Sequence, residues 1–178
     1  MPTNLPQFRY HPDPVRTGMF EASSEECLCC GKSRGHIYVG PVYGEEELQE
    51  ALCPWCIKDG SAAKKMGASF ADDQFLLQAK LPKAVVDEVH LRTPAFFSWQ
   101  SERWLAHCGD ACAFLGDASA QDLAKATETT KQLWRESHKL KEEDWNHMLK
   151  GYQPRGHNAF YKFVCLHCDQ ILFGWDCS

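Results

Sequence analysis

Two short segments, Cys27-Leu-Cys-Cys-Gly31 and Cys53-Pro-Trp-Cys56, decide the fold of this chain. Each holds two cysteines separated by two residues, a spacing that lets both sulfurs reach one metal ion about 2.3 Å away. Gly31 permits the tight backbone turn beyond the second cysteine. Pro54 is typical of the first turn of a helix, whose free N–H groups favour thiolates. We therefore predict a structural zinc site with the ligands Cys27, Cys30, Cys53 and Cys56.

The order of the two pairs predicts a treble-clef-like zinc module. After the Cys27/Cys30 knuckle comes a β segment, residues 37–43, which has to end or bulge near Gly40-Pro41. A helix then supplies the other two ligands from its first turn. Four protein ligands leave no open coordination position, so we expect this zinc to be structural rather than catalytic. The alternative for Cys53/Cys56 is a thioredoxin-like redox motif, but the βαβ frame that such a motif needs is missing.

A second zinc site is possible further along the chain. Cys165-Leu-His-Cys168 lies between two predicted strands, residues 159–164 and 170–175, at the tip of a hairpin. Cys108 and Cys112 are four residues apart and would share one face of a helix. Cys108, Cys112, Cys165 and Cys168 can then close the site, with His107, His167 and Cys177 as substitute ligands. The alternative is that these cysteines are buried as small hydrophobic residues without a metal.

Composition predicts a globular protein of the cytoplasm. Of the 178 residues 44% are hydrophobic, including six Trp and ten Phe, which is enough for a core. Residues 1–10 lack the apolar stretch of a secretion signal, and no apolar run approaches the roughly 18 residues that cross a bilayer. Ten cysteines in a reducing compartment more often bind metal than form disulfides.

The rest of the chain completes an α+β fold. Leu81-Pro82 opens a helix, and residues 119–151 form the most helical stretch. We expect residues 1–80 to form an N-terminal arm and the zinc module. Residues 81–178 are expected to form a helical region with a C-terminal zinc-knuckle β-hairpin, packed with the first part as one domain.

The charge distribution favours a protein partner over nucleic acid. The net charge is −5, and residues 1–60 carry five positive and nine negative side chains. Phosphate-binding proteins usually show a basic patch, which is missing here, so nucleic acid is not an expected partner. A membrane is not expected either, because no apolar run is long enough to cross one. An acidic surface attracts a basic protein. The run Glu45-Glu46-Glu47, with Glu50, is the predicted contact, although such runs are often only solvated helix faces.

The sequence lacks a recognisable catalytic constellation. No phosphate-binding loop or His-Glu-x2-His motif occurs. His11-Pro-Asp-Pro14 could pair an imidazole with a carboxylate for acid–base chemistry, but it more simply shapes the N-terminal arm. We therefore predict a protein without enzymatic activity.

Several segments resemble the CbrC family of bacterial proteins. They include Phe8-Arg-Tyr-His-Pro-Asp-Pro14 and, above all, Leu52-Cys-Pro-Trp-Cys-Ile-Lys-Asp-Gly-Ser-Ala-Ala63, and the resemblance covers nearly the whole chain. The name of that family is tied to tolerance of a nuclease colicin, and related proteins occur as immunity partners of secreted antibacterial toxins. The resemblance implies an immunity or tolerance protein that binds and occludes a toxin, with a basic nuclease as the expected partner. The alternatives are a zinc-finger protein that binds nucleic acid and a thiol- or metal-dependent enzyme.

Overall fold

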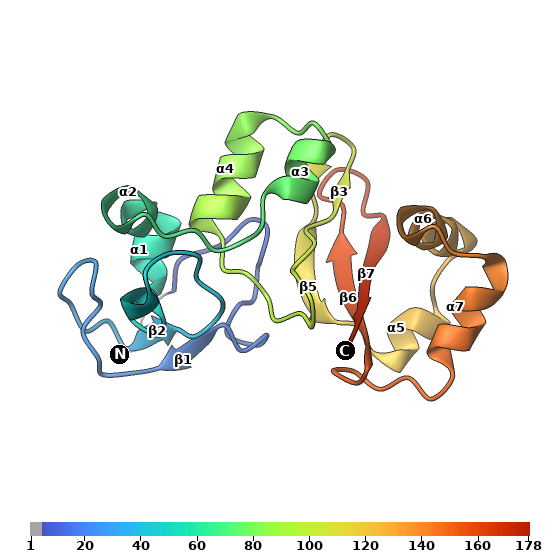
Figure 1. Cartoon of the computed structure of the whole chain (residues 1–178), viewed down its shortest axis with the longest axis horizontal. Coiled ribbons are helices and arrows are strands. Elements are labelled where there is room, and N and C mark those ends of the chain that lie inside the picture. Colours follow the sequence, from blue (N-terminus) through green and yellow to red (C-terminus); the bar gives the residue numbers. More distant parts are fainter. Residues whose placement is uncertain (1–4) are drawn as a thin grey trace.

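A three-stranded sheet lies between an N-terminal module and a group of helices (Figure 1). The computed structural model describes residues 5–178; residues 1–4, the beginning of the predicted N-terminal arm, lie outside the described residues. Helices and antiparallel strands follow one another in separate runs along the chain, so the predicted α+β class is confirmed. In the part of the chain that is described, no helix has both the length and the apolar character needed to cross a membrane.

The N-terminal module is built from short elements. In order these are β1 (Phe20–Ala22), β2 (His36–Tyr38), the 3-10 helix η1 (Glu46–Leu48), α1 (Pro54–Lys58) and α2 (Ser61–Met66). Strands β1 and β2 pair antiparallel, and β2 ends at Tyr38, before Gly40-Pro41. The helix expected from Pro54 onward is interrupted at Gly60, whose φ of +78° is left-handed backbone that glycine adopts without strain. The module therefore has two helices where the pattern predicted one.

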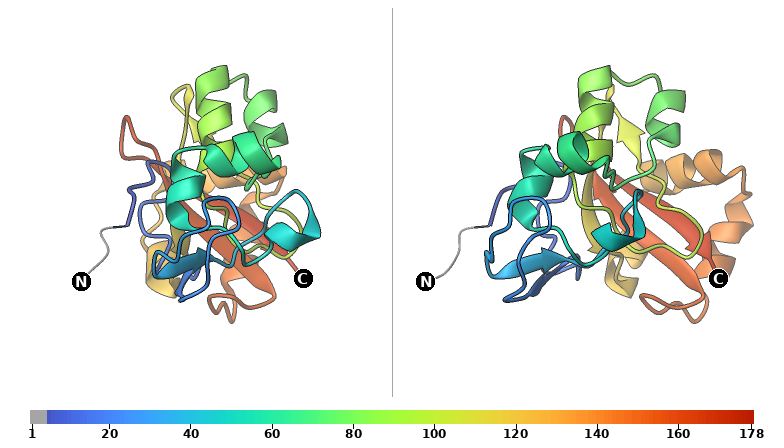
Figure 2. Two further views of the ribbon diagram at one scale, coloured as in Figure 1. Left: turned by 90° about the vertical axis from the view of Figure 1, so that its left-hand side faces the viewer. Right: turned by 60° about the vertical axis from the view of Figure 1, so that its left-hand side comes forward.

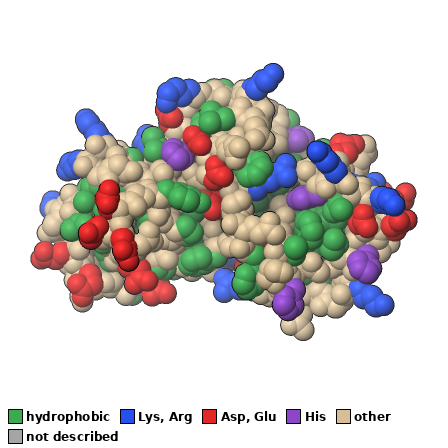
Figure 3. Space-filling model, viewed as in Figure 1, with side chains coloured by type: hydrophobic (Ala, Val, Ile, Leu, Met, Phe, Trp, Pro, Cys, Tyr) green, Lys and Arg blue, Asp and Glu red, His purple; other side chains and the backbone are tan. Residues whose placement is uncertain are grey.

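Acidic side chains gather over this module (Figure 3). Glu45, Glu46, Glu47 and Glu50 are all exposed, on and around η1. Leu48 faces inward from the same turn and is buried in the core of the module. The acidic run therefore faces solvent, and burial of Leu48 in the core of the module holds its backbone in place.

Helix α4 (Lys83–Arg92) connects the module to the rest of the protein. It follows α3 (Gln74–Gln78) and begins after Pro82, as the Leu81-Pro82 pair predicts. Lys58 Nζ pairs with Glu88 Oε1 at 2.8 Å, and Arg92 Nε donates to the Lys58 carbonyl at 2.9 Å. These contacts hold α4 against α1, so the two predicted parts, residues 1–80 and 81–178, are packed together.

The sheet consists of β5 (Ala113–Asp117), β6 (Asn158–Val164) and β7 (Ile171–Cys177), with β6 in the centre. The predicted C-terminal hairpin is confirmed, and its register runs from Asn158↔Cys177 to Val164↔Ile171. Strand β5 was not predicted, and it pairs with β6 through Phe114↔Phe163.

Both faces of the sheet are buried, because alternate residues of a strand point to opposite sides. Tyr161, Phe163 and Leu172 face a core that also contains Tyr10, Phe96 and Trp104. Phe160 and Phe173 face Trp134 and Trp145 on the other side. That side is covered by α5 (Ala120–Ala124), α6 (Glu128–His138) and α7 (Glu142–Leu149), as Figure 2 shows.

Residues 106–111 form a small hairpin, not the helix that the spacing of Cys108 and Cys112 predicted. Strand β3 (Ala106–His107) pairs with β4 (Asp110–Ala111), and Cys108-Gly109 is the two-residue turn between them. Both turn residues have positive φ, +51° and +73°, as a type I′ turn requires. The helical prediction was wrong because it took the cysteine spacing as helical and overlooked Cys-Gly as a turn.

Candidate metal centre

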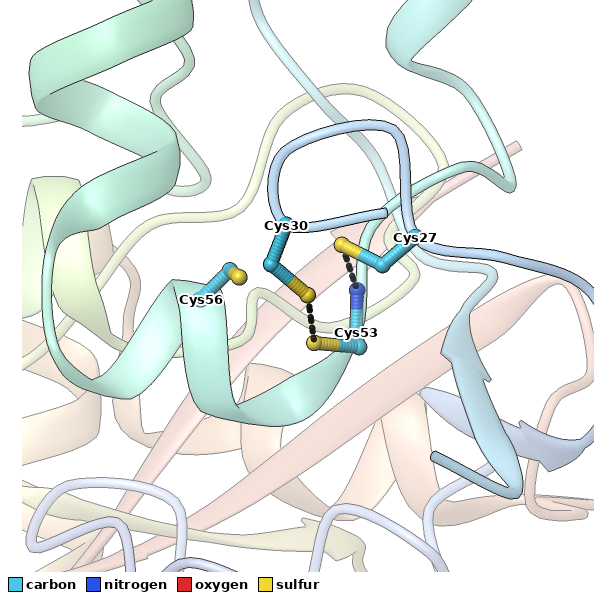
Figure 4. Close-up of side chains that lie close together, drawn as sticks. All are labelled: Cys27, Cys30, Cys53 and Cys56. Carbon is cyan, nitrogen blue, oxygen red and sulfur yellow. Dashed lines mark hydrogen bonds between the residues drawn. The ribbon is translucent and has the colours of Figure 1, made fainter. Parts of the chain in front are cut away.

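The four cysteines Cys27, Cys30, Cys53 and Cys56 converge on one point (Figure 4). Their sulfurs all lie within 4.8 Å of one another, and Cys30 Sγ is 3.9 Å from Cys53 Sγ. A tetrahedral zinc ion with bonds of about 2.3 Å places its sulfur ligands about 3.8 Å apart. A disulfide would bring two sulfurs to about 2.05 Å. The geometry therefore fits a metal ion held by four thiolates.

The first two sulfurs come from a knuckle whose backbone is fixed by two hydrogen bonds. The N–H of Cys27 donates to the Lys32 carbonyl at 3.1 Å, and the N–H of Gly31 donates to the Cys27 carbonyl at 2.7 Å. Gly31 has a φ of +63°, a left-handed conformation that glycine adopts without strain, in the tight turn predicted there. This turn brings Cys30 back over Cys27, so that both sulfurs face the same point.

The other two sulfurs come from the beginning of α1. Cys53 precedes the helix in extended conformation, and Pro54 occupies its first turn. The N–H of Cys56 donates to the Cys53 carbonyl at 3.1 Å, which places the two side chains on one turn. Strand β2 holds this segment, because the N–H of Tyr38 donates to the Leu52 carbonyl at 2.8 Å.

The charge of the thiolates is stabilised unevenly. A hydrogen bond from the Cys53 thiol and backbone N–H groups outweigh burial and lower the pKa of Cys27 to about 4. Burial raises the pKa of Cys56 to about 12. A divalent cation at the centre of the group stabilises all four thiolates together. Because Cys27, Cys53 and Cys56 are buried and four ligands complete a tetrahedron, the arrangement can support the fold but offers no open position to a substrate.

The structure brings together three of the four cysteines of the predicted second group. Cys108, Cys165 and Cys168 lie together with His107, their ligand atoms within 4.8 Å of one another. Cys112 is outside the group, and this corrects the prediction. It follows β4 and is 1% exposed in the core beside Trp104, where burial raises its pKa to about 12.

Among the substitute ligands that the sequence offered, His107 takes the fourth position. His167 instead contacts Asp110, with 2.9 Å between His167 Nε2 and Asp110 Oδ2. Cys177 is the last residue of β7 and pairs with Asn158 at the opposite end of the hairpin from the knuckle. If Cys108-Gly109 had been recognised as a hairpin turn, His107 and Cys108 would have been placed together at the tip of that hairpin and Cys112 away from it.

His11 has a structural environment. Its side chain is 0% exposed, with Nδ1 2.9 Å from the Pro94 carbonyl and Nε2 2.7 Å from Thr17 Oγ1. Burial lowers its pKa to about 4, so the ring is neutral at pH 7. Asp13 is exposed and pairs with Arg16. The His11-Pro-Asp-Pro14 segment therefore fastens the N-terminal arm and places no acid–base pair at the surface.

Comparison with known proteins identifies the family of the chain. Residues 5–177 match the model of UPF0167, described as an uncharacterised protein family. A UPF0167 protein of Pseudomonas aeruginosa is 46% identical over 180 residues, with 97% of each chain covered. UPF0167 proteins of Mycobacterium bovis and Mycobacterium tuberculosis are each 44% identical over 172 residues, covering 94% of this chain and 90% of theirs. No solved structure gives a significant match. With a family match over nearly its whole length and relatives of this similarity, the chain belongs to the UPF0167 family.

Proposed function

We propose that this chain is an immunity or tolerance protein that binds and occludes an antibacterial toxin, with a basic nuclease as the partner. Zinc is the metal of its scaffold in this proposal, because a closed tetrahedron of four thiolates is a typical structural zinc site. The protein acts by covering a surface of the toxin and performs no chemistry of its own. The CbrC resemblance of the Leu52–Ala63 segment, which surrounds Cys53 and Cys56, motivates the choice of a nuclease.

One observation carries the proposal: a rigidly held acidic surface with uncompensated charge. Within residues 5–178, no ion pair involves Glu45, Glu46, Glu47 or Glu50. The N–H of Leu28, inside the knuckle, donates to the carbonyl of Ala51 at 2.8 Å and so ties the end of the acidic segment to the metal centre. A surface held in this way loses little conformational freedom when a partner binds.

An exposed apolar side chain completes this surface. Leu28 is 53% exposed beside the acidic segment, and an apolar contact ringed by charge is a common arrangement in protein interfaces. The DNA-binding surface of a nuclease is positively charged because it contacts phosphates. Carboxylates speed encounter with such a surface and compete with DNA for it, whereas they repel DNA itself.

The test uses purified nuclease domains of bacteriocins as partners. Calorimetry is expected to detect one-to-one binding to at least one of them, and the complex should lose DNA cleavage. Binding should weaken as salt rises, because exposed charges are screened. If none of the domains binds and expression of the protein leaves cells sensitive to every toxin in the panel, the proposal is wrong.

A matched pair of variants locates the contact. Glu46→Gln with Glu47→Gln removes two charges from the proposed surface, and affinity should fall by about tenfold, mainly through slower association. Glu142→Gln with Glu143→Gln removes two exposed charges from α7, outside the acidic module, and should leave affinity unchanged. Equal losses in both variants would indicate a general effect of net charge and would argue against the acidic run as the contact.

A further inference from the structure

Two hairpin turns that are distant in sequence meet at one edge of the sheet. One is the Cys108-Gly109 turn between β3 and β4, and the other is the turn from Cys165 to Gln170 between β6 and β7. Cys108 Sγ in the first turn lies 3.7 Å from Cys168 Sγ in the second, although the two residues are 60 positions apart in the sequence.

The C-terminal turn repeats the backbone of the first knuckle. The N–H of Cys165 donates to the Gln170 carbonyl at 2.9 Å, and the N–H of Asp169 donates to the Cys165 carbonyl at 3.1 Å. The same two bonds fix Cys27 to Lys32 and Gly31 to Cys27. Asp169 has a φ of +57°, so it occupies the left-handed position that Gly31 occupies in the first knuckle.

A backbone N–H group also points at the first sulfur of each knuckle. In the C-terminal knuckle it is the N–H of His167, 3.5 Å from Cys165 Sγ, and in the first knuckle it is the N–H of Cys53, from the start of α1, 3.2 Å from Cys27 Sγ. Such contacts stabilise a thiolate.

The distances match a tetrahedron of one nitrogen and three sulfurs. Bonds of about 2.05 Å to nitrogen and about 2.3 Å to sulfur place nitrogen and sulfur ligands about 3.6 Å apart and two sulfurs about 3.8 Å apart. His107 Nδ1 is 3.5 Å from Cys168 Sγ and 3.2 Å from Cys108 Sγ. Cys108 also has a φ of +51°, a strained conformation for a residue other than glycine, which metal ligation would help to hold.

We propose that His107, Cys108, Cys165 and Cys168 bind a second zinc ion, which clamps the β3–β4 hairpin to the β6–β7 knuckle. This inference does not depend on the identity of the partner. A set of one imidazole and three thiolates in tetrahedral geometry is typical of structural zinc. Binding releases the protons of those ligands that carry one.

The clamp also holds the N-terminal arm. Asp110 directly follows the Cys108-Gly109 turn and is 6% exposed. Its carboxylate accepts from Arg9 Nη2 and the Tyr10 hydroxyl, both at 2.7 Å, and contacts His167 Nε2 at 2.9 Å. The second ion thus fixes the place where the arm, the β3–β4 hairpin and the C-terminal knuckle meet.

The two centres differ in access to solvent. Cys108 and Cys168 are exposed, whereas Cys27, Cys53 and Cys56 are buried. A chelator can reach the second ion directly, but it reaches the first only when the module opens. The second ion should therefore be lost first.

Metal content of the purified, reduced full chain tests the ligand set. Two zinc ions per chain are expected, and Cys168→Ser should reduce this to one. Cys112→Ser and Cys177→Ser are the controls, and both should retain two. A single zinc in the unaltered protein, or two in Cys168→Ser, would overturn the proposal.

Two measurements on the unaltered chain guard against variants that fail to fold. Zinc-edge X-ray absorption should report seven Zn–S bonds and one Zn–N bond per two ions; eight Zn–S bonds would reject His107 as a ligand. Release of zinc to a chromogenic chelator should show one fast and one slow phase of equal size. A single slow phase would contradict the exposed clamp.

Discussion

The backbone N–H of Cys53 donates a hydrogen bond to the Sγ of Cys27 over 3.2 Å, joining the start of α1 to the knuckle. The bond shows that the two cysteine pairs share more than a metal position. The N–H at the start of α1 stabilises negative charge on Cys27 Sγ, and the knuckle packs against the start of the helix. Neither half of the N-terminal module has a complete core without the other, because Cys27, Cys53, Cys56, Leu52 and Ile57 are buried in one cluster.

Loss of the first metal should therefore unfold the whole module. Binding of a structural zinc contributes roughly 10 kcal/mol, which is comparable to the entire stability of a small domain. Cys56→Ser, or prolonged chelation, should abolish the circular dichroism of α1 and α2 and raise sensitivity to proteases in residues 5–70. Cys29→Ser is the control, because Cys29 Sγ lies 3.6 Å from Ser61 Oγ and outside the ligand group. An unchanged spectrum for Cys56→Ser would contradict a structural role for the metal.

Burial of neutral His11 should make stability fall in mild acid. Its pKa is about 4 in the folded protein and about 6.5 when unfolded, so the unfolded chain binds more protons between these values. The contribution is fully present above pH 6.5 and is lost as the pH falls towards 4. Between pH 7 and pH 5 this single group should cost about 2 kcal/mol of unfolding free energy.

The measurement compares urea unfolding of the unaltered protein and His11→Gln at both pH values. Thiolates of the metal centres also take up protons in acid, but they do so in both proteins, so the difference between the two reports on His11. The variant should be less stable at pH 7 and show the shallower pH dependence. Parallel curves would mean that His11 is not buried in the neutral form.

Much of the fold could be predicted where local chemistry specifies it. The local patterns that did so are Cys-x2-Cys followed by Gly31, Pro54 after Cys53, and the predicted strands 159–164 and 170–175 on either side of Cys165-Leu-His-Cys168. Strand β5 could not be recognised in this way. Its residues read Ala-Phe-Leu-Gly-Asp, and only pairing with β6 in a core shared with Phe96 and Trp104 makes them a strand.

The second ligand set was only partly predictable for a similar reason. Cysteine spacing alone treats Cys108 and Cys112 as equivalent, whereas the structure separates them by a reversal of the chain. Cys-Gly at the centre of the hairpin is a local signal, but its meaning depends on the neighbouring pairs Ala106↔Ala111 and His107↔Asp110. Because the chain reverses at Cys108-Gly109, His107 lies next to the turn, whereas Cys112 lies beyond β4 and is buried in the core.

Replacing Asp110 should loosen the N-terminal arm. Asp110→Asn keeps the size of the side chain but removes the charge that Arg9 pairs with and one acceptor for Tyr10 or His167. Removing the charge from a buried, hydrogen-bonded carboxylate lowers the free energy of unfolding by about 2 to 4 kcal/mol. Thermal unfolding should show the loss, and hydrogen exchange should locate it at residues 8–11 and 106–111. Asp87→Asn, which removes an exposed pair with Lys83, should change neither measurement appreciably.

Gly31 and Asp169 occupy matching left-handed positions in the two knuckles, which predicts how much different substitutions of Gly31 should destabilise the protein. A Cβ added to Gly31 meets no atom within 4 Å, so only its φ of +63° opposes substitution. Gly31→Ala should cost about 1 kcal/mol, because alanine resists the left-handed conformation. Gly31→Asn should cost less, because asparagine tolerates that conformation and Asp169 already adopts it at the matching position. Urea unfolding of the zinc-loaded variants measures the order; if alanine were the milder change, the backbone of the two knuckles would not be equivalent.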